Sequence, residues 1–220
     1  MSKAVLISIR PKWCEKICNG EKIIEVRKTR PKMNTPFKCY IYCTQPSVRY
    51  QTICGCHVLN SDELYRHPEH GIKHGDSIEL MLCENYTKDN FLNGKVIGEF
   101  TCDRINRLAR VGFDGSGEPA KYYICNSDMS VLPLVGICED ACLTKKELEK
   151  YLGGHEGFGW YISDLRIYDA PRELSEFERP YECNECDAKW ASECNACHEE
   201  GKIKRAPQSW CYVEAMNDGC

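Results

Sequence analysis

Short runs of apolar and β-branched residues recur along this chain and predict a protein built mainly of strands. The run at residues 4–9 is apolar except for Ser8, which is typical of a buried strand. The segment at 22–27 is rich in branched residues, and the segment at 37–44 alternates well enough for another strand. Further strands are expected at residues 52–59, 77–83, 94–105, 160–168 and 208–214.

Two segments carry the end signals of short helices. Pro11 opens a run with apolar residues at helical spacing, and Gly20 follows the end of that run. Thr144 stands three residues before Glu147, which is typical of a capping box, and Gly153 closes the helix that follows. Many short strands with few short helices predict a mostly β barrel or an α+β fold.

Composition indicates a folded protein without a membrane-spanning helix. Of the 220 residues, 42% are apolar and 28% are charged, and no window reaches the roughly 18 consecutive apolar residues that a span needs. No export signal is recognisable, so a cytoplasmic location is expected. No linker divides the chain. We therefore expect one domain formed by residues 1–182 and 203–216, with 183–202 as an excursion and 217–220 as a tail.

Seventeen cysteines are present, and most stand singly among apolar residues, where a thiol packs as a small hydrophobic group. The exceptions are two pairs with metal-ligand spacing, Cys183-x-x-Cys186 and Cys194-x-x-Cys197. Four thiolates at this spacing can converge on one tetrahedral ion, and the polar segment around them has few apolar residues with which to form its own core. A structural zinc ion is expected there. The alternatives are free thiols, two disulfides, an iron–sulfur cluster, or His198 in place of Cys197.

Charge is distributed unevenly along the chain, although the net charge is only −4. Residues 1–50 carry 11 Lys and Arg against 3 Glu, whereas residues 169–200 carry 3 Lys and Arg against 10 Asp and Glu. The basic part can hold an anionic ligand, and the acidic face around the cysteine pairs can meet a basic protein partner. The alternative is two solvated faces of opposite sign.

One basic segment carries candidate chemistry. Lys22, Glu25 and Arg27 lie on or beside a predicted strand, where Glu25 and Arg27 point to the same face. The preceding helix turns the chain, so these groups can gather beside Arg10. A lysine and an arginine near one carboxylate can hold a phosphate or polarise a carbonyl, with Glu25 orienting them or acting as a base. The alternative is an exposed ladder of ion pairs.

The segment Gly20-x-Lys22-x-x-Glu25-x-Arg27 resembles the signature of the ASCH family, and the flanking segments resemble its bacterial and phage-type members. The resemblance implies an α+β, mostly β, PUA-like barrel with a few short helices, and a cleft lined by the signature residues. It also implies an RNA or nucleotide-like ligand, for which aromatic side chains offer stacking surfaces. The aromatic candidates are Tyr40, Tyr42, Phe158, Trp160, Tyr161 and Trp210.

Three functions are therefore carried forward. The first is an RNA- or nucleotide-binding module that uses Arg10, Lys22, Glu25 and Arg27. The second is a small hydrolase, an amidohydrolase or ribonuclease, with Lys22 and Glu25 catalytic. Related amidohydrolases acting on acetylated cytidine have threonines where this chain has Ile23 and Glu25, so the expected hydroxyl nucleophile is missing. The third is a protein-interaction module built around the cysteine pairs.

Overall fold

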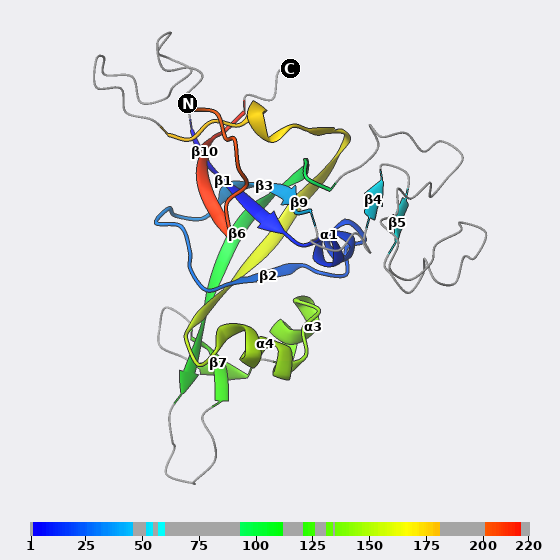
Figure 1. The fold of residues 1–220 in the computed structure, drawn as a ribbon. Coiled ribbons are helices and arrows are strands. Elements are labelled where there is room, and N and C mark those ends of the chain that lie inside the picture. Colours follow the sequence, from blue (N-terminus) through cyan, green and yellow to red (C-terminus); the bar gives the residue numbers. More distant parts are fainter. Residues whose placement is uncertain are drawn as a thin grey trace, which may run out of the picture. The chain divides into compact units, whose positions relative to one another are not determined.

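The computed structural model describes residues 2–45, 52–54, 57–59, 93–111, 121–125, 131–133, 135–180 and 201–216 (Figure 1). The chain divides into two compact units. Unit 1 comprises Met1–Cys18, Lys38–Phe100 and Leu165–Cys220, and unit 2 comprises Asn19–Phe37 and Thr101–Asp164. The expectation of a single domain with an excursion stays a prediction.

Unit 1 is built around a sheet in which β10, β1, β3 and β6 lie side by side in this order. Strand β1 pairs antiparallel with β10 and parallel with β3. The elements are β1 (Lys3–Ile9), α1 (Pro11–Cys18), β3 (Phe37–Cys43), β4 (Thr52–Cys54), β5 (His57–Leu59), the start of β6 (Val96–Val111), the end of β9 (Gly157–Arg172), the short 3₁₀ helix η3 (Leu174–Glu176) and β10 (Trp210–Glu214).

The apolar run at the N-terminus forms β1, as predicted, because both of its faces are covered. Ala4 and Leu6 pack in a cluster with Tyr40, Phe177 and Val213. The other residues of the strand from Ala4 onward are also buried. Burial of apolar side chains is the main force that holds such a strand in a sheet. The predicted helix after Pro11 is confirmed as α1, which buries Pro11, Cys14 and Ile17.

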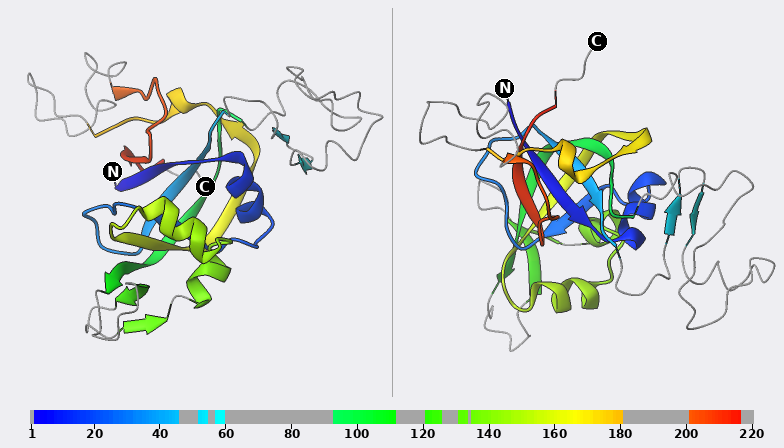
Figure 2. Two further views of the ribbon diagram at one scale, coloured as in Figure 1. Left: turned by 60° about the horizontal axis from the view of Figure 1, so that its bottom comes forward. Right: turned by 45° about the horizontal axis from the view of Figure 1, so that its top comes forward.

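Unit 2 combines strands with two short helices. Strand β2 (Ile24–Arg27) pairs antiparallel with the first half of β9, and β7 (Lys121–Cys125) pairs with the end of β6 and with β8 (Val131–Pro133). Helices α3 (Val135–Asp140) and α4 (Lys145–Leu152) pack on one face of β2 (Figure 2). Their shared core consists of Ile24, Val26, Leu108, Ile137, Ala141, Leu148 and Leu152.

Helix α4 begins and ends where the sequence predicts. The Thr144 hydroxyl accepts a hydrogen bond from the Glu147 backbone N–H at 3.2 Å, and the Glu147 carboxylate accepts one from the Thr144 N–H at 2.8 Å. Gly153 ends the helix with a φ of 64°, a left-handed conformation that glycine adopts without steric cost.

Strand β9 opens with a sequence of small and large residues in alternation, Gly157-Phe158-Gly159-Trp160. A Cβ atom added at Gly157 would lie 2.5 Å from a methyl carbon of Leu152, and one added at Gly159 would lie 3.2 Å from Ile24. The two glycines therefore let the core under α3 and α4 lie directly on the backbone of β9. The two aromatic residues are left for the opposite face of the strand.

Several details differ from the sequence prediction. The single strand expected at 52–59 is wrong: β4 and β5 form an antiparallel pair with Thr52 opposite Leu59, and the sequence between them contains Gly55, a residue type that favours turns. Strands β6 and β9 extend further than predicted. The pattern missed α3, β7 and β8, whereas the strand expected at 77–83 lies outside the described residues.

The secondary structure confirms the predicted α+β, mostly β class: strands predominate, and the helices are short. Within the part of the chain that the structure describes, no helix is long and apolar enough to cross a membrane.

Candidate functional site

The two faces of β2 carry different chemistry. Ile24 and Val26 pack against the helices of unit 2, and the alternation of a strand therefore directs Glu25 and Arg27 to the opposite face. All four residues are buried, with Glu25 only 6% and Arg27 only 8% exposed. The same alternation that makes the strand amphipathic thus places two charged side chains in a largely water-free environment.

Glu25 lies between two cationic groups. Its Oε2 is 3.3 Å from Nζ of Lys22, and its Oε1 is 3.0 Å from Nε of Arg27. Lys22 is only 2% exposed. We call these three residues the Lys-Glu-Arg cluster. The structure therefore brings together three of the four residues that the sequence singled out, and it buries them, in contrast to an exposed ladder of ion pairs.

Lys22 is fixed from a second side by the C-terminal end of α3. Its Nζ donates a hydrogen bond of 2.8 Å to the carbonyl oxygen of Ala141, and the neighbouring Ile23 N–H donates one of 2.9 Å to the carbonyl of Asp140. The carbonyl groups at the C-terminal end of a helix attract cations. The segment before β2 is thereby anchored to α3, which limits where the lysine ammonium group can lie.

The end of α3 is itself held in a defined turn. The Cys142 N–H bonds to the carbonyl of Glu139, and the Leu143 N–H bonds to the carbonyl of Cys138, each at 2.9 Å. Cys142 has a φ of 53°, and this pattern with a left-handed residue is the Schellman motif that often closes helices. The Cys142 thiol also contacts the carbonyl of Glu21 at 3.3 Å. The turn that presents the Ala141 carbonyl to Lys22 is therefore tied to the motif segment.

Aromatic side chains share the face that carries the cluster. The register of β2 and β9 places Trp160 opposite Glu25 and Phe158 opposite Arg27. Trp160 is fully buried, and its ring meets that of Phe37 edge to face, with centroids 5.9 Å apart. Such neighbours lower the local dielectric, and charge interactions in the cluster are consequently stronger than they would be in water.

The cluster contains two cations and one carboxylate, and so carries one net positive charge. Removing charged groups from water is costly, and ion pairing recovers only part of that cost. An anion that contacts Lys22 or Arg27 would be attracted more strongly here than at an exposed cation, because little water is present to screen the charges. The arrangement is thus chemically suited to holding a phosphate or carboxylate group.

Of the remaining predicted site residues, Arg10 lies in unit 1, between β1 and α1, and is exposed. Its backbone carbonyl accepts hydrogen bonds from the N–H groups of Trp13 and Cys14, which begins α1. Its participation in the site stays a prediction.

The four predicted metal ligands lie outside the described residues: Cys183, Cys186, Cys194 and Cys197. Among the residues that are described, no group of three or more His, Cys, Asp or Glu is arranged to hold a metal ion.

The sequence indicated the aromatic candidates but not which of them lie beside the cluster and which lie in the core. Phe158 and Trp160 share the face of the cluster, whereas Tyr40 packs in the core of unit 1. Tyr161 points to the other face of β9, where the Arg104 guanidinium stacks 3.7 Å from its ring centroid. The Ala141 carbonyl was missed altogether, since a backbone acceptor carries no signal in the sequence.

No family model matches this chain, and no curated protein matches its sequence. It is similar to a solved structure of an ASCH protein from Zymomonas mobilis, with 15% identity and a TM-score of 0.48 over 96% of this chain and 87% of that one. Structures of Tyr-to-Phe and Ser-to-Ala variants from the same organism give 14% identity and TM-scores of 0.48. These alignments cover 97% and 96% of this chain and 91% and 88% of those chains. ASCH is also the family that the Gly20–Arg27 motif resembles.

Proposed function

We propose that this chain is an RNA- or nucleotide-binding module and that the Lys-Glu-Arg cluster contacts a phosphate group of the ligand. The observation that supports the proposal most directly is the burial of two cationic side chains, Lys22 and Arg27, beside the Glu25 carboxylate. Buried cations attract an anion more strongly than exposed ones, because water screens the exposed ones. The resemblance of the motif to the ASCH signature agrees with a ligand of this class.

Each member of the cluster has its own part in this proposal. Arg27 offers a planar guanidinium, whose fork of N–H groups matches two oxygens of a phosphate. Glu25 contacts Nε of Arg27 and so orients the guanidinium. Lys22 adds the second positive charge from a position fixed by the end of α3. Phe158, half-buried and opposite Arg27, offers a ring on which a base can stack.

The geometry favours binding over catalysis. Both carboxylate oxygens of Glu25 already contact cations, so Glu25 would lose at least one of these contacts if it accepted a proton from a substrate. The hydrolase alternative, with Lys22 and Glu25 catalytic, stays a prediction that no contact in the cluster specifically favours.

The test is the affinity for a fluorescein-labelled single-stranded RNA, measured by fluorescence anisotropy. We expect Arg27→Gln to weaken binding about 10- to 100-fold, the effect of losing a charged hydrogen bond worth roughly 1.5–3 kcal/mol. Arg27→Lys keeps the charge but loses the fork, so an intermediate affinity is expected. The matched control is Arg107→Gln, since Arg107 belongs to the same unit and also pairs with a glutamate, Glu156, but is exposed.

Thermal unfolding of each variant shows whether the fold is retained. Equal losses of affinity in Arg27→Gln and Arg107→Gln would contradict the proposal, because they would reflect net charge and not the cluster. Undetectable binding of both RNA and mononucleotides by the wild-type protein would also overturn it.

A further inference from the structure

The segment that follows β2 concentrates positive charge at the surface of unit 2. Residues 28–32 read Lys-Thr-Arg-Pro-Lys, with Lys28, Arg30 and Lys32 exposed. We call this segment the basic loop. It begins directly after Arg27, the last residue of β2. No acidic residue occurs between Glu25 and the start of β3, so this whole stretch of chain is cationic.

Two side chains of the basic loop have no carboxylate partner among the described residues. Lys28 lies over the ring of Tyr151, with Nζ 5.5 Å from the ring centroid. Arg30 donates a hydrogen bond from Nε to the carbonyl of the adjacent Pro31, at 3.4 Å. Neither contact neutralises the positive charge. Both groups can therefore attract phosphate oxygens from solution.

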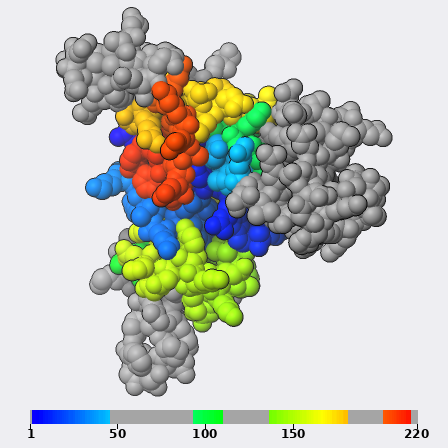
Figure 3. Space-filling view, viewed as in Figure 1, coloured from blue at the N-terminus to red at the C-terminus, as the bar shows by residue number. Residues whose placement is uncertain are grey.

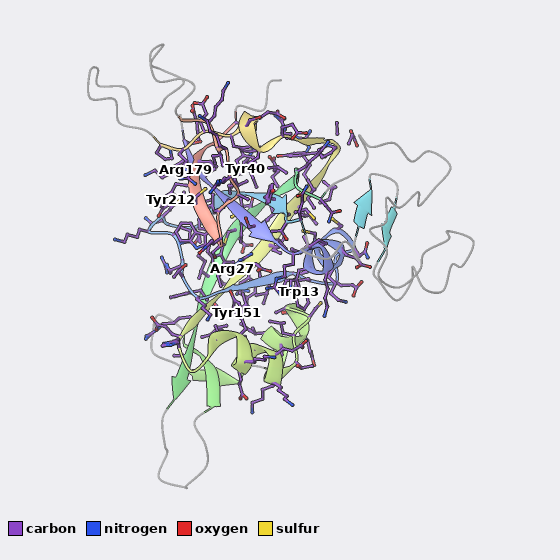
Figure 4. The ribbon with its side chains drawn as sticks, viewed as in Figure 1. Trp13, Arg27, Tyr40, Tyr151, Arg179 and Tyr212 are labelled. Carbon is purple, nitrogen blue, oxygen red and sulfur yellow. The ribbon has the colours of Figure 1, made fainter. Side chains whose placement is uncertain are left out.

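Tyr151 is an unusually exposed aromatic residue for its position. It lies on α4 between Leu148 and Leu152, which are buried in the core of unit 2, yet 39% of Tyr151 is exposed. Figure 4 labels Tyr151 on α4 and Arg27 on β2, and Figure 3 shows the surface to which α4 contributes. An exposed ring beside a cation is the combination on which single-stranded nucleic acids stack their bases.

We propose that Tyr151 and the basic loop hold a strand of single-stranded RNA. A base stacks on the Tyr151 ring, and Lys28 and Arg30 contact phosphate groups on either side of it. The inference rests on the proposed function and goes further, because it specifies a single-stranded polymer and not a free nucleotide. A mononucleotide reaches only the Lys-Glu-Arg cluster, whereas a strand also occupies the surface formed by the loop and α4.

Binding of labelled single-stranded RNA and of uridine monophosphate is compared in three variants at several salt concentrations. For the RNA, Lys28→Ala/Arg30→Ala should lower the slope of log affinity against log salt by about 1.4, since each single-strand phosphate contact contributes roughly 0.7. Tyr151→Ala should weaken RNA binding about tenfold, and Tyr151→Phe should not, because stacking needs the ring alone. Affinity for uridine monophosphate should be unchanged in all three variants.

The charge-matched control is Lys204→Ala/Arg205→Ala, which also removes one lysine and one arginine, both exposed and located in unit 1. If this control lowers the salt slope as much as the loop variant does, net charge explains the effect and the inference is wrong. It is also wrong if the loop variant and Tyr151→Ala bind RNA like the wild type, or if poly-glutamate competes as strongly as RNA.

The failure of the inference and of the proposed function give different results. If Arg27→Gln loses affinity for both ligands while the loop and Tyr151 variants lose none, the proposed function stands and the inference fails. If the wild type binds neither ligand, both fail.

Discussion

Replacing Glu25 by glutamine tests the structural basis of the candidate site most directly. The variant keeps the size of the side chain but leaves Lys22 and Arg27, whose side chains are 2% and 9% exposed, without the carboxylate between them. Removing one partner of a buried ion pair costs about 3–5 kcal/mol. A glutamine oxygen still accepts a hydrogen bond worth about 1 kcal/mol, so we expect a loss of about 2–4 kcal/mol.

The free energy of unfolding is measured by urea denaturation, followed by tryptophan fluorescence because Trp160 stands opposite Glu25. The control is Glu156→Gln, which removes the carboxylate of an exposed pair with Arg107 and should cost less than about 1 kcal/mol. In the Glu25→Gln background, adding Arg27→Gln should cost less than it does in the wild type, since it removes one of two repelling cations.

A Glu25→Gln variant as stable as Glu156→Gln would refute this account of the cluster. The same variant separates the two functions, because it raises the cluster from one net positive charge to two. A binding site for phosphate still binds RNA, because the added positive charge opposes the loss of the contact that orients Arg27. A hydrolase that uses Glu25 as its base loses turnover instead.

Three further predictions concern cysteines. Cys142→Gly should raise the free energy of unfolding, measured in urea, by about 1 kcal/mol, because glycine adopts the left-handed conformation without the steric cost that cysteine has. A lower free energy of unfolding would mean that the thiol contact with the Glu21 carbonyl contributes more stability than the backbone conformation costs. Burial, followed by the nearby Asp103, raises the pKa of the Cys102 thiol from its ordinary 9.0 to about 12. The unfolded chain therefore loses this proton first, and between pH 9 and 12 the free energy of unfolding should fall with rising pH, by up to about 1.4 kcal/mol per pH unit from this group. Cys102→Ala should flatten that dependence, and an unchanged slope would contradict the assignment. Finally, we expect one zinc ion per chain by mass spectrometry of the purified protein, lost in Cys186→Ser/Cys197→Ser; a metal content unaffected by these substitutions would exclude the cysteine pairs as its ligands.

Local signals predicted the elements that depend on local interactions. Thr144 and Glu147 satisfy each other three residues apart, and the apolar run of β1 is long enough to require burial whatever packs against it. The motif residues were identified for the same reason, since Glu25 and Arg27 share one face of a short strand. These features could be predicted because their physical cause lies within a few residues of chain.

What could not be predicted depends on distant partners. Lys22 is held by the carbonyl of Ala141, 119 residues further along the chain, and no residue near Lys22 in the sequence indicates this contact. Helix α3 contains a glycine and a β-branched valine, so its local propensity is low and its existence depends on packing of Ile137 and Ala141 in the core. The burial of the charged cluster was missed likewise, because charged residues usually indicate an exposed surface.

The glycines of β9 affect which substitutions this protein can accept during evolution. Any side chain at Gly157 would push against Leu152, the residue that follows Tyr151 on α4. Either the Leu152 side chain would have to change its rotamer or the helix would have to shift, and a shift of the helix would move the exposed tyrosine with it. A mutation on the covered side of a strand, next to the Arg27 carbonyl and the Leu152 side chain, can in the second case alter the spacing of surface groups that a ligand would meet. Selection for recognition would then act on a position that has no side chain at all.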